Sequence, residues 1–238
     1  MFCLRIPLNL AAIGTIKAEL LHSLPEVKSS HRIEAVARGL GFQSNAAMRA
    51  VVQQHNNVQV DVLWEPFVTY LTQHGFDANA PHLYRACARV AVEDVLRKFP
   101  QLTISGLESG RLQRKADGTR ETVEQQRERI NNSREELLER GSMDDFLLCL
   151  AMLAHVKPRK TINTSHGSYG LKHMAEKFHG TYPDGSALGP GYVTNGAFIA
   201  AAVCAGFSVR PIPETPNALF NMSKRDIAEV RYGLMDAY

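Results

Sequence analysis

Apolar residues recur at helical spacing along most of this 238-residue chain, and prolines or glycines separate one such segment from the next. The first segment runs from Leu8 to Leu24 and stops at Pro25. Short stretches at 102–106 and 208–212 are the only strand candidates. We therefore expect a mainly α protein, with one or more multi-helix domains that contain helix-turn-helix-like hairpins and at most a minor strand pair.

The polar stretch that begins at residue 103 suggests a domain boundary. We expect an N-terminal helical domain over 1–102 and a polar turn with a charged connecting helix over 103–141. A C-terminal helical domain then covers 142–238. The connecting helix has little apolar surface, which is typical of a solvated helix.

Two segments, 30–55 and 168–206, follow the same order of helix, aromatic turn, polar cap and small-residue helix, although an insertion separates the first helix from the turn in the second segment. This order is compatible with a helix-turn-helix, in which the second helix presents its first side chains to the DNA major groove. Helical hairpins that only pack together follow the same pattern, so that alternative stays open. The predicted base contacts are Gln43, Ser44, Asn45 and Arg49 in the first unit, and Thr194 and Asn195 in the second.

Positive charge is concentrated around both units, although the net charge is only +3. Residues 1–60 carry six basic and three acidic side chains, and residues 155–180 carry five basic and one acidic. Lys157, Arg159 and Lys160 form the densest basic group. Such a group binds phosphates without reading sequence, although it also fits a solvated loop.

Residue patterns that fix a reaction are weak. His155, His166, His173 and His179 do not have the spacing of metal ligands on one helix. The glycine-rich loop 183–196 precedes a helix and could direct N–H groups at an anion, but it lacks the phosphate-loop pattern and a preceding strand. We therefore expect a binding protein rather than an enzyme, and we assign no catalytic residue, metal or cofactor.

The first residues lack the basic start of a signal peptide, and no apolar run is long enough to cross a bilayer. The four cysteines are widely spaced, which is typical of free thiols in a reducing compartment. A cytoplasmic protein without membrane contact is the expectation.

The stretches "KTINTSHGSYGLKHMAEKF", "TYPDGSALGPGYVTNGAFIAAAVCAGF" and "NALFNMSKRDI" together resemble a family of uncharacterised proteins carried on proteobacterial plasmids and integrative elements. The stretch "VKSSHRIEAVARGLGFQSNAAMRA" resembles a helical module at the start of other mobile-element proteins. The resemblance implies a bacterial protein linked to mobile DNA, with a role in regulation, maintenance, transfer or counter-defence. It carries over no catalytic or binding residue.

Together these patterns favour a mobile-element accessory protein that binds DNA through helix-turn-helix-like units and flanking basic residues. One alternative is a protein-interaction module, such as an inhibitor of a host defence complex, in which the apolar helix 194–206 packs against a host or plasmid protein or in a homodimer. A second alternative is a small enzyme that uses the loop 183–196.

Overall fold

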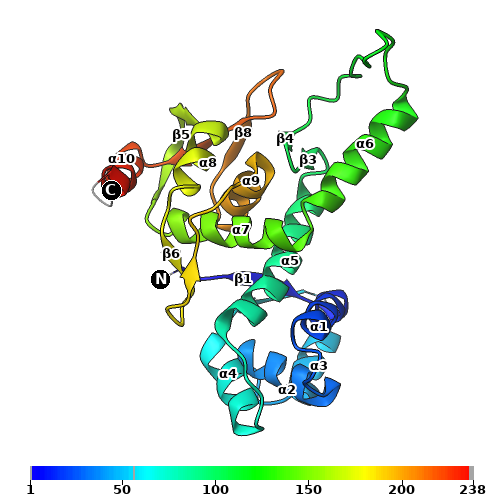
Figure 1. The fold of residues 1–238 in the computed structure, drawn as a ribbon, viewed down its shortest axis with the longest axis vertical. Helices are drawn as coiled ribbons and strands as arrows, with labels where there is room; N and C mark the ends of the chain where they lie inside the picture. The colour runs from blue at the N-terminus through cyan, green and yellow to red at the C-terminus, as the bar shows by residue number, and fades with distance from the viewer. Residues whose placement is uncertain (1, 56, 236–238) are drawn as a thin grey trace. The chain divides into compact units, whose positions relative to one another are not determined.

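In a computed structural model that describes residues 2–55 and 57–235, helices and strands are mixed along the whole chain (Figure 1). The described residues form ten helices and nine strands, and the strands make four sheets. The expectation of a mainly α fold with a minor strand pair is therefore wrong. Most strands are only two to five residues long and several pair with distant segments, so they leave little local periodicity. The chain divides into two compact units.

Unit 1 comprises the described residues up to Asp94 together with His179–Gly189. Its elements are β1 (Arg5–Leu8), α1 (Leu10–Ser23), α2 (Ser29–Gly39), α3 (Asn45–Gln54), β2 (Val58–Asp61), α4 (Trp64–Gln73), the first part of α5 (Ala80–Lys98), β6 (Gly180–Thr181) and β7 (Ala187–Leu188). The pairs β1–β2 and β6–β7 are both antiparallel.

The core of unit 1 depends on a close approach of α2 to α4 and α5. A Cβ on Gly39 would lie 2.9 Å from Phe67 Cβ and 2.7 Å from Leu83 Cδ2, which is closer than carbon atoms pack. Phe67 and Leu83 are fully buried. Only glycine at the end of α2 therefore permits this packing.

Residues 60–76 had the pattern of one helix with a kink at Pro66, and the structure corrects this. Val58–Asp61 instead pair with β1, and α4 begins at Trp64. Pro66 therefore lies in the first turn of α4, where its missing N–H costs no helical hydrogen bond.

Unit 2 comprises the remainder of α5 from Val95, residues up to Phe178, and the described residues from Pro190 onward. Its elements are β3 (Leu102–Thr103), β4 (Gly106–Leu107), α6 (Val123–Glu136), α7 (Arg140–Leu153), β5 (Pro158–Gly167), α8 (Ser168–Ala175), α9 (Asn195–Cys204), β8 (Val209–Pro211), β9 (Ala218–Met222) and α10 (Lys224–Met235). The strands β5, β9 and β8 form an antiparallel sheet in that order.

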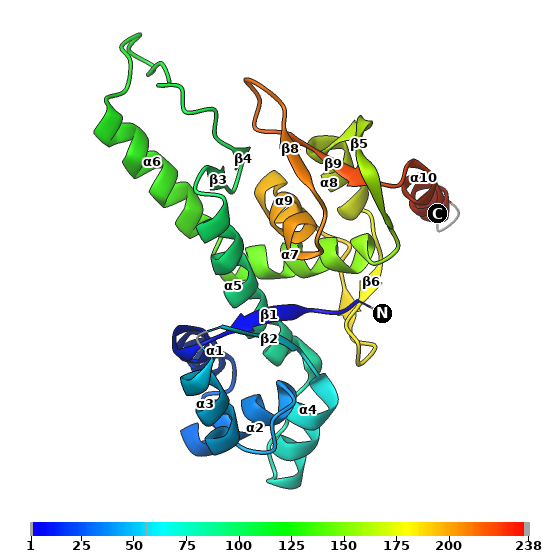
Figure 2. The same cartoon turned by 180° about the vertical axis from the view of Figure 1, so that it is seen from behind.

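The core of unit 2 lies between two helices and this sheet. The helices α7 and α9 lie side by side in both ribbon views (Figures 1 and 2). Burial alternates along β9, so that Ala218, Phe220 and Met222 point inward. The Phe220 ring meets Phe198 of α9 edge to face, with centroids 5.7 Å apart.

Residues 108–136 form an arm that extends from the rest of unit 2 in both ribbon views (Figures 1 and 2). Helix α6 makes up its second half and buries none of its side chains. The segment 103–141, which we expected to connect two domains, lies within unit 2. The solvated helix expected there corresponds to α6.

Candidate nucleic-acid interface

Three segments of unit 2, residues 157–167, 208–211 and 218–225, bring positive charge together because they contain β5, β8 and β9. We call these segments the basic sheet. They contain six lysines and arginines and no aspartate or glutamate. All six are exposed residues: Lys157, Arg159, Lys160, Arg210, Lys224 and Arg225. A surface with one sign of charge attracts ligands of the opposite sign.

Acidic neighbours outside these three segments offset part of this charge. Of the six cations, only Arg225 forms an ion pair within the described part of the chain, with Glu229 at 2.8 Å. That pair is solvent-exposed and contributes little. The nearby Asp226 carboxylate accepts a hydrogen bond from the backbone N–H of Lys157 at 2.8 Å, which lowers the pKa of Asp226. The positive charges of Lys157 and Arg225 lower the pKa of Asp226 further, so this carboxylate offsets part of the charge of both cations.

The backbone beneath these cations is fixed by Asn221 of β9. Its Nδ2 donates to the carbonyl of Arg159 at 2.8 Å, and its Oδ1 accepts from the N–H of Ser208 at 2.7 Å. The pairing of β5 with β9 shifts register between Pro158 and Asn163. Bulges of this kind redirect side chains. Arg159 lies within this irregular stretch, its side chain is exposed and its carbonyl is held by Asn221.

His166 lies at the end of β5, and nearby positive charges help to lower its pKa. Burial lowers the pKa of His166, and the positive charges of Arg231 and Lys224 lower it further. The imidazole Nδ1 lies 3.3 Å from Nδ2 of Asn163. A bound polyanion would offset these positive charges and raise the pKa of His166.

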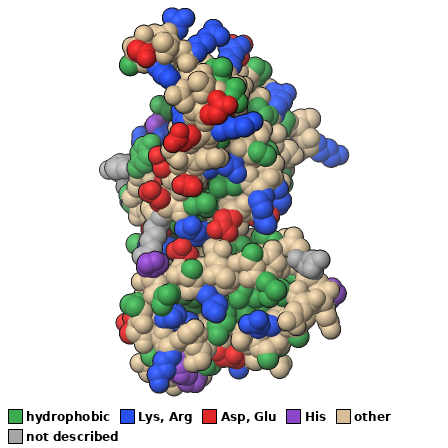
Figure 3. Space-filling view, turned by 90° about the vertical axis from the view of Figure 1, so that its right-hand side faces the viewer, with side chains coloured by type: hydrophobic (Ala, Val, Ile, Leu, Met, Phe, Trp, Pro, Cys, Tyr) green, Lys and Arg blue, Asp and Glu red, His purple; other side chains and the backbone are tan. Residues whose placement is uncertain are grey.

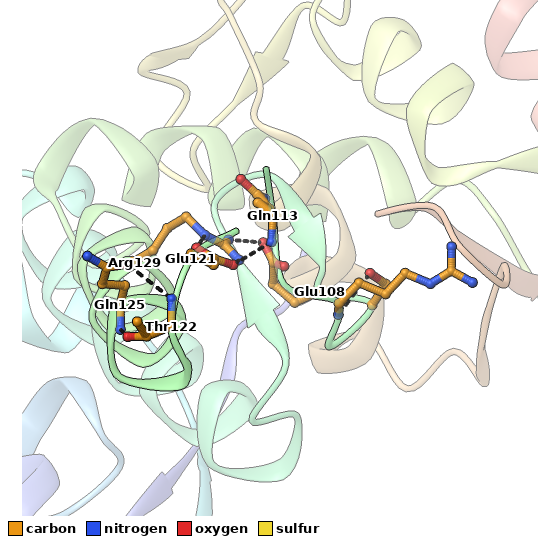
Figure 4. Close-up of polar contacts among 8 residues, drawn as sticks. Glu108, Gln113, Glu121, Thr122, Gln125 and Arg129 are labelled. Atoms are coloured by element: carbon orange, nitrogen blue, oxygen red, sulfur yellow. Dashed lines mark hydrogen bonds and ion pairs between the residues drawn. The ribbon is translucent and has the colours of Figure 1, made fainter. Parts of the chain in front are cut away.

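A cluster of polar contacts joins the two halves of the arm, the loop 108–122 and α6, as Figure 4 shows. Arg129 of α6 donates to Glu108 at 2.9 Å and to Glu121 at 3.0 Å. Thr122 and Gln125 form a reciprocal capping box at the start of α6. Arg129 therefore offsets one of the two glutamate charges, and this group of three side chains keeps a net negative charge.

The tip of the arm, residues 111–120, has an excess of basic side chains (Figure 3, top). Arg114 and Arg120 face each other across an isolated β-bridge, and like charges placed directly opposite each other are unfavourable. Asp117 is the only acid of this tip, and its carboxylate accepts hydrogen bonds from Thr119. The exposed basic residues are Arg111, Arg114, Lys115 and Arg120, of which Arg111 pairs with Glu214. The tip is therefore a second surface suited to an anion.

The first predicted hairpin corresponds to α2, a turn and α3 in unit 1. Gln43 and Arg49 are exposed, whereas Ser44 and Asn45 are half-buried. Ser44 caps α3 by accepting from the N–H of Ala47. The N–H of Asn45 donates to the Glu34 carboxylate at 2.9 Å. Because Glu34 already supplies an anion at this helix end, only Gln43 and Arg49 remain suited to a nucleic-acid contact.

The second predicted hairpin corresponds to α8, which ends at Ala175, and α9, which begins at Asn195 and contacts α8. Asn195 is 7% exposed, and its Nδ2 donates to the carbonyls of Ser105 and Pro216 and to Oδ1 of Asn217. The structure therefore gives no support for a base contact by Asn195.

Thr194 is occupied as the cap of α9, where its hydroxyl accepts from the N–H of Ala197. Residues 195–202 of this helix are buried inside unit 2. Unit 2 itself therefore covers most of this helix, and the part that stays accessible is its end, residues 203–206.

The glycine-rich loop 183–196 does not present free N–H groups to a phosphate in its first part. The Asp184 carboxylate accepts from the N–H groups of Ala80, at the start of α5, and Ser186. The ammonium of Lys172 donates to Glu176 and to the carbonyl of Val193, so it does not supply a free cation to this loop.

The described residues contain neither a candidate metal site nor a membrane-spanning helix. No group of three His, Cys, Asp or Glu side chains has the arrangement of a metal site there. Among the helices described, none has both the length and the apolarity needed to cross a membrane.

The sequence did not identify Arg210, Lys224 or Arg225 as partners of Lys157 and its neighbours. The lack of acidic residues in 208–211 and 218–225 was a usable signal. It was insufficient, because only the pairing of β9 with both β5 and β8 joins these segments.

The stretches that resemble a mobile-element family lie in both units. In unit 2 they include β5, α8, α9 and β9, and in unit 1 they include α2 and α3. Comparisons with protein-family models, curated proteins and solved structures found no match.

Proposed function

We propose that this chain binds nucleic acid through the basic sheet of unit 2. The observation that carries the proposal is the set of six exposed cations without an acidic residue in the same three segments. Phosphate contacts by lysine and arginine supply most of the affinity in non-specific nucleic-acid binding. The exposed hydroxyls of Thr161, Thr164 and Ser165 on β5 add hydrogen-bond donors of the kind that contact phosphate oxygens.

The arm tip and α3 extend this proposal as separate surfaces. The opposed Arg114 and Arg120 gain most from a phosphate, because an anion relieves their mutual repulsion. On α3, Arg49 and Gln43 are exposed and the helix itself contains no acidic residue. The resemblance to mobile-element proteins makes DNA of such an element the natural ligand to examine.

The test compares two variants with the same change in net charge. Lys157→Gln/Lys160→Gln removes two cations from the basic sheet, and Lys17→Gln/Lys28→Gln removes two exposed cations from unit 1. Both variants lower the net charge from +3 to +1. Fluorescence anisotropy with labelled random-sequence DNA, in single-stranded and duplex form, measures the affinity across a salt series.

The proposal predicts weaker DNA binding by the sheet variant. The slope of log affinity against log salt concentration should become shallower by about one to two, since each lost phosphate contact lowers its magnitude by about 0.7 to 0.9. The unit 1 variant should retain the affinity and slope of the parent chain. Equal behaviour of the two variants, or no binding by the parent chain at low salt, would overturn the proposal.

A further inference from the structure

Two exposed tyrosines of unit 2 share one buried lysine. The ammonium of Lys172 lies 4.9 Å from the ring centroid of Tyr192 and 5.5 Å from that of Tyr169. Both distances are within the range of a cation–π interaction. Tyr192 is 72% exposed and Tyr169 is 57% exposed, whereas Lys172 is 5% exposed. The rings therefore cover the cation and keep much of their own surface in solvent.

Lys172 is not available to hold a phosphate. Its Nζ donates to Glu176 Oε1 at 2.7 Å and to the carbonyl of Val193 at 3.1 Å. Burial acts to raise the pKa of Glu176, but hydrogen bonds from Lys172 and His173 outweigh it and lower that pKa. The charge of Lys172 is thus neutralised by a carboxylate, while its ammonium lies against both rings.

The backbone on each side of Tyr192 is tied to α8. The N–H of Gly191 donates to the carbonyl of Glu176 at 3.2 Å, and the N–H of Val193 donates to the Glu176 carboxylate at 3.4 Å. Together with the bond from Lys172 to Val193, these contacts hold an exposed ring on an ordered loop. A ring that is already ordered loses little entropy when a ligand stacks on it.

Tyr169 is ordered by a neighbour on its own helix. The His173 ring meets Tyr169 at a centroid distance of 4.6 Å and an interplanar angle of 90°. The His173 Nδ1 lies 2.6 Å from Glu176 Oε2, so the same carboxylate supports both tyrosines.

Tyr169 follows shortly after the first segment of the basic sheet. Strand β5 ends at Gly167, and Tyr169 follows in the first turn of α8. The N–H of Ala218 in β9 donates to the hydroxyl of Ser168 at 3.1 Å, which fixes the start of α8 to the sheet. Phosphate-binding cations and exposed aromatic rings therefore lie on adjoining parts of one unit.

We propose that Tyr169 and Tyr192 stack on unpaired bases, so that the preferred ligand of this unit is a single strand; this inference rests on the proposed nucleic-acid binding. Bases of a duplex stack on one another and offer only their edges, whereas bases of a single strand offer their faces to aromatic side chains. Stacking of this kind depends weakly on base identity and lowers affinity about tenfold per lost ring.

The experiment measures single-strand and duplex affinity for Tyr169→Leu, Tyr192→Leu and Tyr192→Phe. The control is Tyr232→Leu, which removes a ring that is 67% exposed on α10 and has no ring contact among the described residues. The probes are labelled oligothymidylate and a mixed-sequence duplex, and thermal melting checks that each variant is folded.

We expect each leucine variant to lose about tenfold in single-strand affinity with an unchanged salt slope. Duplex affinity should stay constant, Tyr192→Phe should bind like the parent chain, and Tyr232→Leu should have no effect. Single-strand affinities of Tyr169→Leu and Tyr192→Leu within twofold of Tyr232→Leu would overturn the stacking inference. If Lys157→Gln/Lys160→Gln still weakens binding in that case, nucleic-acid binding stands and only the strand preference fails.

Discussion

Replacement of Asp145 by asparagine is expected to stabilise the fold at neutral pH. Asp145 lies on α7 and is half-buried, and its carboxylate accepts a hydrogen bond from the N–H of Thr194 at 3.4 Å. The pKa of Asp145 is raised to about 6, mainly by burial and further by the negative charges of Asp144 and Glu176. The hydrogen bond from the N–H of Thr194 acts in the opposite direction and lowers this pKa. The neighbouring ammonium of Lys172 lowers the same pKa.

The magnitude follows from the difference between this pKa and the ordinary value of 3.8. Because the folded state holds the proton more tightly than the unfolded chain does, Asp145 favours the fold below about pH 3.8, and this contribution is lost as the pH rises through about 6. The full difference corresponds to about 3 kcal/mol. Solvent screening of a half-buried group reduces this to about 1–2 kcal/mol.

Asp145→Asn keeps an oxygen that accepts from Thr194 and removes the charge. We therefore expect the free energy of unfolding to rise by about 1–2 kcal/mol near pH 8 and to change little near pH 4. Urea unfolding followed by circular dichroism, on parent and variant at several pH values, measures this difference. Groups that titrate equally in both proteins cancel from it.

Asp117→Asn is the matched control. Hydrogen bonds from Thr119 lower the pKa of Asp117, which is exposed at the arm tip, so this variant should show no stabilisation at neutral pH. A gain for Asp145→Asn that is independent of pH, or absent near pH 8, would refute the assignment of a costly buried charge to Asp145.

Three further substitutions test the packing and ion pairs of unit 2. Gly196→Ala places a Cβ about 2.0 Å from the Thr103 carbonyl oxygen, and urea unfolding should show a loss of about 1–3 kcal/mol. Arg129→Ala leaves two glutamates of the arm unpaired, and limited proteolysis should cut the arm faster while the melting temperature changes little. Lys172→Met leaves Glu176 without its cation, which should cost about 3–5 kcal/mol, and Lys172→Met/Glu176→Leu should recover much of this loss.

The sequence predicted helices better than strands, because helical signals are local. The expected helix 81–99 corresponds closely to α5, and the cap expected near the start of 194–207 is Thr194. The strand expected at 208–212 matches β8. In each case the residues that form the sequence pattern are close to each other along the chain.

Strand β5 shows why the remainder was not predictable. Its charged start, Lys157 to Lys160, is typical of a solvated loop, and its β-branched residues follow only afterwards. The segment is a strand because it pairs with β9, which lies about 60 residues away in sequence. Two prolines, Pro213 and Pro216, precede Phe220 and give this stretch the pattern of a turn, yet Phe220 lies in β9, which continues to Met222.

The candidate site was predictable only in part for the same reason. Lys157, Arg159 and Lys160 are adjacent in sequence, so composition alone could identify them. Tyr192 is remote in sequence from Tyr169, and the contact that relates them passes through a buried lysine. No local periodicity reports such a contact.

In the proposed site, the residues that contact phosphates differ from the residues that stack on bases. The two groups should therefore contribute separately to the free energy of binding. The cations of the basic sheet are exposed, whereas Lys172, which lies against the rings, is neutralised by Glu176. Sites that share no partner contribute additively to a free energy. The losses from Lys157→Gln/Lys160→Gln and from Tyr192→Leu should therefore add in single-strand binding, with only the first changing the salt slope. A combined loss smaller than the sum would mean that the rings orient the strand toward the cations, because removing one contact would then already have displaced the other.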